Sequence, residues 1–379
     1  MQQQKFKWRN LIFFMSTPAI ALVGVPYYLY HYDLSSFDIA LFIFYMYATG
    51  LSITMGYHRL FAHSTYKANP FVRFFLIFFG AAAFEQSVLE WASQHRDHHL
   101  YVDTQKDPYN IKQGFWYAHL GWIFRWRNNE YSNVKDLQKD PIIQSQHNHY
   151  MFWAIGTGVL TPILLSYIGG GSMLAAFIFS VALRLTFVHH STFFINSVCH
   201  TFGKTTYDDK STAKDHWFVA MLTNGEGYHN FHHRFPGDFR NGVRWYHWDP
   251  SKWFIGLLEN IGLAWDVRRI SRFRILEARI EAEKQRVINE LALLGTDHHL
   301  SFQEKVNDIF NMLKNKLAAW DQAVSEFNKK RQEHRSNKEA KKLLGTIRKD
   351  VYQARQGFLQ EYNQWIRFVK NDLGMAFAV

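Results

Sequence analysis

The chain is poor in the residues that cross-link proteins or break helices. It contains one cysteine, Cys199, so no disulfide bond can form within the chain. It has 8 prolines, none of them after Pro250, so the C-terminal part lacks the residue that most strongly interrupts helices. Cys199 precedes His200 and could ligate a metal, but we expect it to be a small buried side chain.

Three motifs are also missing from the sequence. There is no His-Glu-x-x-His stretch, which excludes the common zinc-protease site. Glu-x-x-His is not repeated, as it is in the helical bundles that bind two metals through carboxylates. The His-Pro-Gly-Gly stretch of haem-binding cytochrome b5 domains does not occur either.

Charge and apolar residues are unevenly distributed along the 379 residues. Apolar residues, with 34 Phe, 19 Tyr and 13 Trp, concentrate before about residue 200, whereas charged residues dominate after about residue 266. The net charge of +11 could indicate nucleic-acid binding. In a membrane protein it indicates cytoplasmic loops beside anionic headgroups, and we therefore expect no nucleic-acid partner.

Four apolar stretches have the length of transmembrane helices, which need ~20 residues. They group into two hairpins, and their predicted ranges are 11–30, 37–56, 151–168 and 172–194. Lys and Arg flank the first hairpin at both ends, which places those ends in the cytoplasm. The basic N-terminus lacks a small-residue cleavage site, so we expect a retained anchor rather than a signal peptide.

Two further stretches are predicted to lie at the membrane surface. Residues 71–91 are apolar but contain Arg73, Glu85 and Glu90, and a full crossing would separate the histidine motifs described below. We expect this stretch to be one helix that lies in the interface or dips partway into the bilayer. Residues 114–124 are rich in Trp, Tyr and Phe and are predicted to form a second surface helix.

The sequence thus predicts an all-α integral membrane protein. Four transmembrane helices and a cytoplasmic helical cap form one domain, 1–270, and a charged, amphipathic, helical C-terminal extension forms the other, 271–379. The extension is expected to contain two or three helices, with breaks near Gly295 and Gly345. It could pack on itself, form an oligomer or lie on the membrane.

Histidines are the candidate metal ligands. Two His-x-x-His-His triplets occur, at His95, His98 and His99 and at His229, His232 and His233. Positions i, i+3 and i+4 share a helix face, so each triplet is predicted to direct its imidazoles at a common point.

Two further ligand groups extend this set. His58 and His63 are five residues apart, ~140° on a regular α-helix, which predicts that they serve different metals. Asn196 and His200 share a helix face through their i, i+4 spacing. Nine histidines exceed the ligand number of one ion and suit two ions, whose identity the spacing leaves open between iron, copper and zinc.

The motifs and the words around them resemble the membrane fatty-acid desaturases, specifically the Δ9 acyl-CoA (stearoyl-CoA) desaturase group. The resemblance runs from about residue 37 to residue 269 and rests on stretches that include the three histidine motifs. The stretches are Gly-Tyr-His-Arg-Leu-Phe-Ala-His (56–63), Trp-Ala-Ser-Gln-His-Arg-Asp-His-His (91–99), Asp-Pro-Tyr (107–109), Gly-Trp (121–122), Asn-Ser-Val-Cys-His (196–200) and Gly-Glu-Gly-Tyr-His-Asn-Phe-His-His-Arg-Phe-Pro (225–236).

The resemblance implies an enzyme that uses O₂, two irons and external electrons to insert a cis double bond into a saturated acyl-CoA. In the family, matching histidines hold the irons and the asparagine matching Asn196 acts through a water. The positions that carry this expectation are His58, His63, His95, His98, His99, Asn196, His200, His229, His232 and His233. The electron donor is expected to be a separate protein, either a ferredoxin or one of the cytochrome b5 and flavin reductase type. The enzyme is expected to lie in a bacterial inner membrane.

Substrate contacts are less clearly marked. Trp91 matches a tryptophan at the bend of the family's acyl tunnel, but it could equally anchor the interface. Ser93 and Gln94 stand where the animal enzymes have charged residues that hold CoA, which leaves acyl-ACP and glycerolipid open as alternative carriers. Arg125 and Arg127 could bind a phosphate group instead.

Other functions fit parts of the pattern. A membrane hydroxylase uses similar histidine motifs, and its product would distinguish it. A metal transporter would place ligands near the bilayer midplane, whereas these follow the ends of the spans. Glu226, three residues before His229, is expected to orient a ligand histidine or to cap a helix, and His189 is expected to pack.

Overall fold

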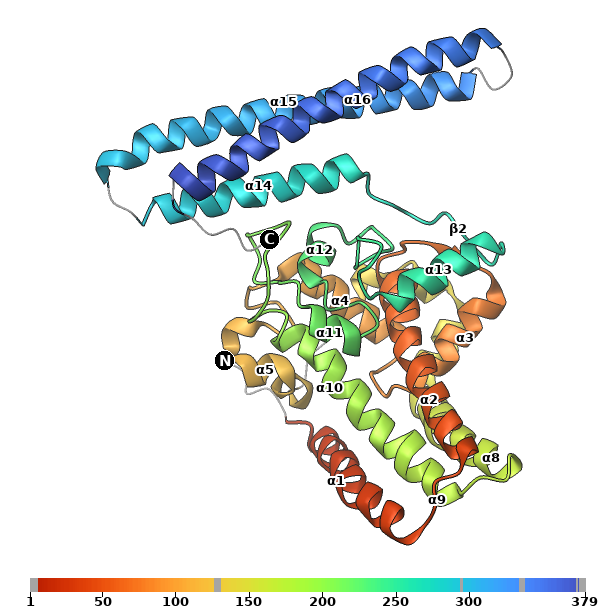
Figure 1. Ribbon diagram of the computed structural model, residues 1–379. Helices are drawn as coiled ribbons and strands as arrows, with labels where there is room; N and C mark the ends of the chain where they lie inside the picture. The colour runs from red at the N-terminus through yellow and green to blue at the C-terminus, as the bar shows by residue number, and fades with distance from the viewer. Residues whose placement is uncertain (1–5, 126–130, 294–295, 334–337, 373, 375–379) are drawn as a thin grey trace. The chain divides into compact units, whose positions relative to one another are not determined.

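The computed structural model describes residues 6–125, 131–293, 296–333, 338–372 and 374. The chain forms two compact units, which are described separately. The first contains Met1–Thr205 and Lys210–Arg269, and the second contains Thr206–Asp209 and Ile270–Val379. Figure 1 shows the elements of both units.

Within the described residues, four helices are long and apolar enough to cross a bilayer. They are Trp8–His31, Ser36–Ala62, Tyr150–Ile168 and Met173–Ser197, which confirms the four predicted spans and extends several of their ends. The first span is α1 (Trp8–His31), and the second joins α2 (Ser36–Leu51) to η1 (Ser52–Ala62). The third consists of α7 (Tyr150–Ile155), η6 (Gly156–Leu160) and α8 (Thr161–Ile168). The fourth consists of α9 (Met173–Ala175), η7 (Ala176–Leu183) and α10 (Arg184–Ser197).

Three of the four spans contain π-helical turns, namely η1, η6 and η7. A π-helix bonds residue i to residue i+5 and widens the turn, and such segments occur frequently at functional sites. The one in the second span, η1, carries the first histidine pair, His58 and His63, up to its C-terminal end.

The stretch 71–91 is not one helix, contrary to the prediction. It consists of α3 (Pro70–Ala81), a turn, and the start of α4 (Val88–Tyr101). Phe84 and Gln86 adopt left-handed backbone angles in the turn, with φ of 57° and 77°. The 12 residues of α3 are too few to cross a bilayer, and α4 is a separate helix that carries the second histidine motif. A position of α3 in the interface or partway into the bilayer stays a prediction.

A polar residue from the fourth span satisfies the C-terminal end of α3. The guanidinium of Arg184 donates to the carbonyls of Ala82 and Gly158 at 2.6 and 2.8 Å and to Thr49 Oγ1 at 3.2 Å. Arg184 is fully buried. These bonds give hydrogen-bond partners to backbone carbonyls that would otherwise be unpaired away from water.

The surface helix predicted for 114–124 is shorter and interrupted. It consists of the five-residue α5 (Phe115–His119) and the 3₁₀ turn η3 (Gly121–Phe124). Short 3₁₀ turns also precede and follow it, and α6 (Pro141–Asn148) leads into the third span. These 3₁₀ turns are η2 (Ile111–Gln113), η4 (Ser132–Val134) and η5 (Leu137–Lys139).

The remaining part of the first unit carries the third histidine motif. It contains α11 (Trp217–Leu222), α12 (His229–Arg234) and α13 (Pro250–Asn260). Strand β1 (Lys67–Ala68) pairs antiparallel with β2 (Ala264–Trp265), which ties the chain after the second span to the chain after α13. The main buried core of this unit includes Tyr57, Leu76, Leu89, Val188 and Ile255.

The second unit is helical, with α14 (Arg272–Leu291), α15 (Thr296–Glu333), α16 (Lys338–Arg367) and the π-turn η8 (Phe368–Asp372). Helices α15 and α16 run antiparallel (Figure 1). The buried residues Val306, Phe310, Leu313, Leu317 and Trp320 of α15 recur at alternating spacings of four and three, the repeat of a coiled-coil seam. Gly345 lies inside α16, so the predicted break there is wrong. A single glycine raises the free energy of a helix by only ~1 kcal/mol, which the rest of α16 can offset. Gly295 lies outside the described residues.

Candidate metal centre

The nine histidines singled out in the sequence form two groups in the first unit. Within each group the ligand nitrogens lie within 4.8 Å of one another. One group has five members, His58, His63, His95, His99 and His232, and the other has four, His98, His200, His229 and His233. The structure therefore brings all nine together, in two sets that could each hold a metal ion.

His58 and His63 belong to the same group, contrary to the prediction that they serve different metals. The prediction assumed a regular α-helix, whereas this segment is the π-helix η1. The backbone N–H of His63 donates to the carbonyl of His58 at 3.0 Å, which is the i to i+5 bond of a π-helix. One wide turn thus brings the two imidazoles to one face, in edge-to-face contact with ring centroids 4.9 Å apart.

Each His-x-x-His-His triplet is divided between the two groups, rather than directed at one point. On α4, His95 and His99 join the five-histidine group and His98 joins the other. On α12, His229 and His233 join the four-histidine group and His232 joins the five. On an α-helix residue i+3 lies ~60° behind residue i and residue i+4 lies ~40° ahead, so a helix lying between two centres can supply both.

Within each group, the Nε2 atoms of the rings face one another. In the five-histidine group the Nε2–Nε2 separations are 2.9 Å for His58 and His232, 2.8 Å for His63 and His95, and 2.8 Å for His99 and His232. In the four-histidine group they are 3.2, 3.0 and 3.0 Å for the pairs His98–His233, His200–His229 and His229–His233. Two nitrogens held by one metal at ~2.1 Å and at right angles lie ~3 Å apart, so the rings fit metal ligation.

Polar partners behind three of these rings fix their tautomers. His98 Nδ1 donates to Asp107 Oδ1 at 2.9 Å, and His58 Nδ1 lies 2.7 Å from Glu226 Oε2, which is an ion-pair contact without hydrogen-bond alignment. His200 Nδ1 donates to Thr212 Oγ1 at 2.7 Å, because the Thr212 hydroxyl itself donates to Asp103 Oδ1 at 2.6 Å. With Nδ1 protonated, Nε2 presents a lone pair to the centre, which is the arrangement that metal-binding histidines adopt.

Burial keeps the imidazoles neutral, the form that binds metals. It lowers the pKa of seven of the rings well below 6.5, and the neighbouring imidazoles lower it further. The seven are His63, His95, His99, His200, His229, His232 and His233. Nine neutral imidazoles that converge in this way form a donor set suited to two metal cations.

Behind the five-histidine group lies a buried charge network centred on Glu226. Glu226 Oε1 accepts from the Arg59 guanidinium at 3.0 Å, and Oε2 accepts from Asn241 Nδ2 at 2.6 Å and lies 2.7 Å from His58 Nδ1. Burial alone would raise the pKa of Glu226, but His58 and Arg59 lower it. Glu226 is thus an ionised carboxylate that orients His58, as the sequence suggested.

Asp103 organises the contacts behind the four-histidine group. Its carboxylate accepts from the Thr212 backbone N–H at 2.8 Å and from the Thr212 hydroxyl, and its own backbone N–H donates to Asp107 Oδ2 at 3.2 Å. Its φ of 63° is left-handed. Asp103 therefore fixes both the residue that orients His200 and the residue that orients His98.

Sequence reasoning missed these three residues. Asp107 was noticed only as part of a motif, and its spacing of nine residues from His98 has no regular helical meaning. Thr212 and Asp103 are 109 residues apart, so no local pattern relates them. Asn196 lies on α10 and lines the same cavity as His58, His95, His98 and His229.

A cavity of 730 Å³ extends from the histidines between the spans. It reaches residues of both groups and is lined mainly by apolar side chains of α1, α2 and α10, among them Phe13, Phe14, Met46, Phe187 and Ile195. A largely apolar space that reaches two candidate metal sites suits an aliphatic chain.

Trp91 lines the cavity beside the five-histidine group. Its ring stacks on His95 with centroids 4.8 Å apart, and its Nε1 donates to Glu85 Oε2 at 3.3 Å. Glu85 also accepts from Thr192 Oγ1 at 2.9 Å, and burial raises the pKa of its carboxyl to about 7. Trp91 is therefore a cavity wall held in place by a buried carboxyl.

The other candidate substrate residues lie differently. Gln94 lines the cavity, whereas Ser93 donates to Asn133 Oδ1 at 2.8 Å. Arg125 is exposed, with its guanidinium 5.4 Å from the centre of the Tyr117 ring, and Arg127 lies outside the described residues. His189 donates from Nε2 to the carbonyl of Ala83 at 2.7 Å, which is the packing role expected for it.

The comparisons with known proteins agree with this site. The family model described as fatty acid desaturase matches residues 38–253. A protein of Schizosaccharomyces pombe named probable acyl-CoA desaturase is 39% identical over 285 residues, 74% of this chain and 58% of that protein. Acyl-CoA desaturase 1 of Saccharomyces cerevisiae is 38% identical over 301 residues, 77% of this chain and 58% of its own length.

A third relative is covered almost completely. The sn-1 stearoyl-lipid 9-desaturase of Anabaena variabilis is 33% identical over 269 residues, 70% of this chain and 94% of that protein. The chain thus spans just over half the length of the two yeast relatives but nearly all of the cyanobacterial one.

Proposed function

Because the chain belongs to the fatty acid desaturase family, we propose that it inserts a cis double bond into a saturated fatty acyl chain by consuming O₂. The observation that carries the proposal is the pair of histidine groups at the end of an apolar cavity. Two hydrogens leave adjacent methylenes, and together with two external electrons and two protons they reduce O₂ to two waters.

We propose that the two groups hold iron. His58, His63, His95, His99 and His232 would hold one ion, and His98, His200, His229 and His233 the other. Asn196, which lines the same cavity, would act through a water. When bound, the ions supply the redox chemistry with O₂. Iron is proposed over zinc because the reaction needs a redox-active metal, and Zn²⁺ has no redox chemistry.

The chain's own residues position the metal ligands and the substrate and exclude water from the site. Glu226, Asp107 and Thr212 orient three rings through Nδ1, so the ligand atoms need no rearrangement when metal binds. Trp91, held by Glu85, forms the wall that places the reacting methylenes beside His95. The apolar lining excludes water, which would otherwise consume a reactive species.

The position of the double bond and the acyl carrier are part of the same proposal. We propose acyl-CoA as the substrate and Δ9 as the position, because the two yeast relatives are named acyl-CoA desaturases and the Anabaena relative is named a 9-desaturase. The Anabaena name specifies a lipid, which makes a glycerolipid the second candidate carrier. We also propose a separate electron donor, a cytoplasmic active site and the bacterial membrane expected from the sequence.

The carrier can be tested with the purified full chain in lipid vesicles, loaded with iron and supplied with a reductase and either cytochrome b5 or ferredoxin. Stearoyl-CoA, stearoyl-ACP and a distearoyl glycerolipid are offered separately, and the products are identified by mass spectrometry after derivatisation of the double bond. Oleate formed from stearoyl-CoA supports the proposal, whereas oleate formed only from the lipid would replace the carrier. A hydroxylated product would contradict desaturation.

A further inference from the structure

Helix α13 has apolar side chains on two opposite faces, although it lies outside the four spans. One face packs into the core of the first unit through Ile255, which is fully buried, and Leu258. The opposite face consists of Trp253, Phe254 and Leu257, which are 45–53% exposed, followed by Ile261 at 59%. The polar Glu259 and Asn260 lie at the C-terminal end of α13, so the exposed apolar side chains form a stripe along the helix, and such a stripe is normally covered by something other than water.

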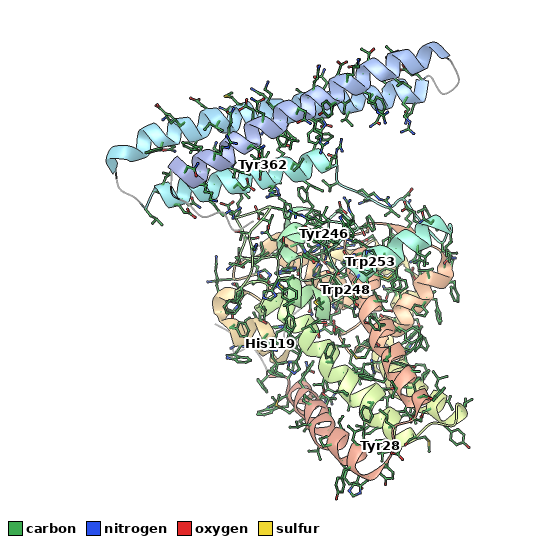
Figure 2. All side chains as sticks on the ribbon, viewed as in Figure 1. Tyr28, His119, Tyr246, Trp248, Trp253 and Tyr362 are labelled. Carbon is green, nitrogen blue, oxygen red and sulfur yellow. The ribbon has the colours of Figure 1, made fainter. Side chains whose placement is uncertain are left out.

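Aromatic residues before and after α13 enlarge this exposed face. Trp248 and Trp253 are in edge-to-face contact with ring centroids 5.4 Å apart, and Trp245, Tyr246 and Trp265 are also exposed. Figure 2 shows Tyr246, Trp248 and Trp253 gathered on the same part of the first unit. We call this set, with the exposed residues of α13, the α13 surface.

The ammonium group of Lys252, in the first turn of α13, points into the protein and away from the α13 surface. Lys252 Nζ donates to the carbonyls of Gly242, Arg244 and His247, at 2.5 to 3.2 Å. The side chain of Asp249 caps the helix by accepting from the Lys252 backbone N–H at 3.0 Å. The polar side chains of Asp249 and Lys252 therefore form hydrogen bonds within the protein, and the aromatic side chains remain exposed on its outside.

Contacts with the second span fix the depth of α13. Ser251 Oγ lies 2.5 Å from Thr54 Oγ1, and Asp249 Oδ1 lies 3.0 Å from the Arg59 guanidinium. The second span begins at Ser36, and a hydrocarbon layer of ~30 Å is crossed by ~20 helical residues, so the span leaves the hydrocarbon close to Thr54. The start of α13 is thereby held at the boundary between hydrocarbon and headgroups.

From these observations we propose that the α13 surface is embedded in the lipid interface. Its occupant is the bilayer itself, because Trp and Tyr prefer the headgroup layer and the surface continues from a span that is already in the membrane. Arg268, exposed just beyond β2, is suited to anionic headgroups. Helix α13 is thus a lipid-facing helix, attached through Asp249 and Arg59 to the turn that carries His58.

The chain is well suited to a direct test of depth by spin labelling. Cys199 is its single cysteine and is fully buried, so a nitroxide reagent should react with an introduced cysteine. We would label Leu257→Cys in the full chain, in vesicles of phosphatidylcholine and phosphatidylglycerol. Collision rates with O₂, which enriches in hydrocarbon, and with a polar nickel chelate would be measured by EPR.

Two positions provide the reference values. Leu164→Cys reports the lipid-facing side of the third span, where Leu164 is 55% exposed, and Lys135→Cys reports an exposed site in a loop before α6. We expect Leu257 to show a ratio of O₂ to nickel collisions that is at least several-fold above that of Lys135 and no higher than that of Leu164. Phe254→Cys serves as a second site on the same surface in case Leu257→Cys does not fold.

Two outcomes would overturn the proposal. A ratio equal to that of Lys135 would mean that the α13 surface faces water. Low collision rates with both reagents, with an immobilised spectrum, would mean that protein covers it, either another segment of this chain or a second copy. Both outcomes leave the desaturase proposal untouched, because neither depends on the metal centre.

Discussion

The backbone N–H of His63 donates to the carbonyl of His58 at 3.0 Å, which makes two histidines five residues apart neighbours on one turn of a π-helix. A regular α-helix would direct them ~140° apart. The π-helix η1 therefore determines which histidines share a metal.

We predict that His58→Ala and His63→Ala remove the same metal ion. Both rings belong to the five-histidine group, whereas His200 belongs to the other. Mössbauer spectra of the ⁵⁷Fe-loaded variants should show the same component lost in the first two and the other component lost in His200→Ala. Loss of different components in His58→Ala and His63→Ala would contradict this assignment.

Glu226→Gln should weaken the five-histidine site and destabilise the protein. The change keeps the shape of the side chain but removes one of the two carboxylates that balance the buried Arg59, the other being Asp249. Because Asp249 remains, the cost should be below the about 3–5 kcal/mol of a buried charge left without a partner, whereas loss of a residue that orients a ligand costs about 10–100-fold in metal affinity. Thermal unfolding and chelator competition measure the two effects. Asp136→Asn, which removes a partly exposed partner of Arg96, is the matched control and should change the stability by less than about 1 kcal/mol.

Thr212 should act as a positioning residue for His200, so its hydroxyl matters more than its size. Thr212→Val removes the group that accepts from His200 Nδ1 and should lower the metal affinity of the four-histidine group by about 10–100-fold, whereas Thr212→Ser should restore it. Iron retention during titration with a chelator gives the comparison. Thr186→Val, which loses only a bond to its own helix at Ala182, is the control. Equal iron loss in Thr212→Val and Thr212→Ser would rule out the hydroxyl's role.

Met46→Trp should shorten the acyl chains that the enzyme accepts. Met46 lines the cavity on the second span, three helical turns before His58, so a larger side chain there fills space that the distal end of the chain would use. The ratio of activity on palmitoyl to stearoyl substrate should rise at least several-fold. Phe44→Trp, a neighbouring position outside the cavity lining, should leave this ratio unchanged. An unchanged ratio in Met46→Trp would place the distal end elsewhere.

The sequence predicted the features that depend on composition and on regular spacing. The four spans follow from apolar length, and the nine histidines attract attention because they recur in motifs. Glu226 could be identified because it lies three residues from His229. The division of the triplets between two sites could not, because i, i+3 and i+4 spacing is compatible with one centre or with two on either side of the helix.

Features that depend on local backbone geometry or on distant contacts were not predictable. Nothing in the composition of η1 distinguishes a π-helix from an α-helix. The turn between α3 and α4 contains left-handed Phe84 and Gln86 where glycine or asparagine would normally signal it, and tertiary bonds such as that from Arg184 to Ala82 hold it. The Asp103–Thr212 contact joins segments 109 residues apart.

Acyl desaturation by the paired histidine groups is tested most directly by fatty-acid profiling in a host that lacks its own desaturase. The host expresses either the intact chain or His232→Ala at matched abundance. His232 is chosen because its Nε2 lies 2.9 Å from that of His58 and 2.8 Å from that of His99, at the middle of the five-histidine group. We predict a new monounsaturated acid, with its double bond at position 9, from the intact chain and none from the variant. A hydroxylated acid, or the same monounsaturated acid from both chains, would contradict the account.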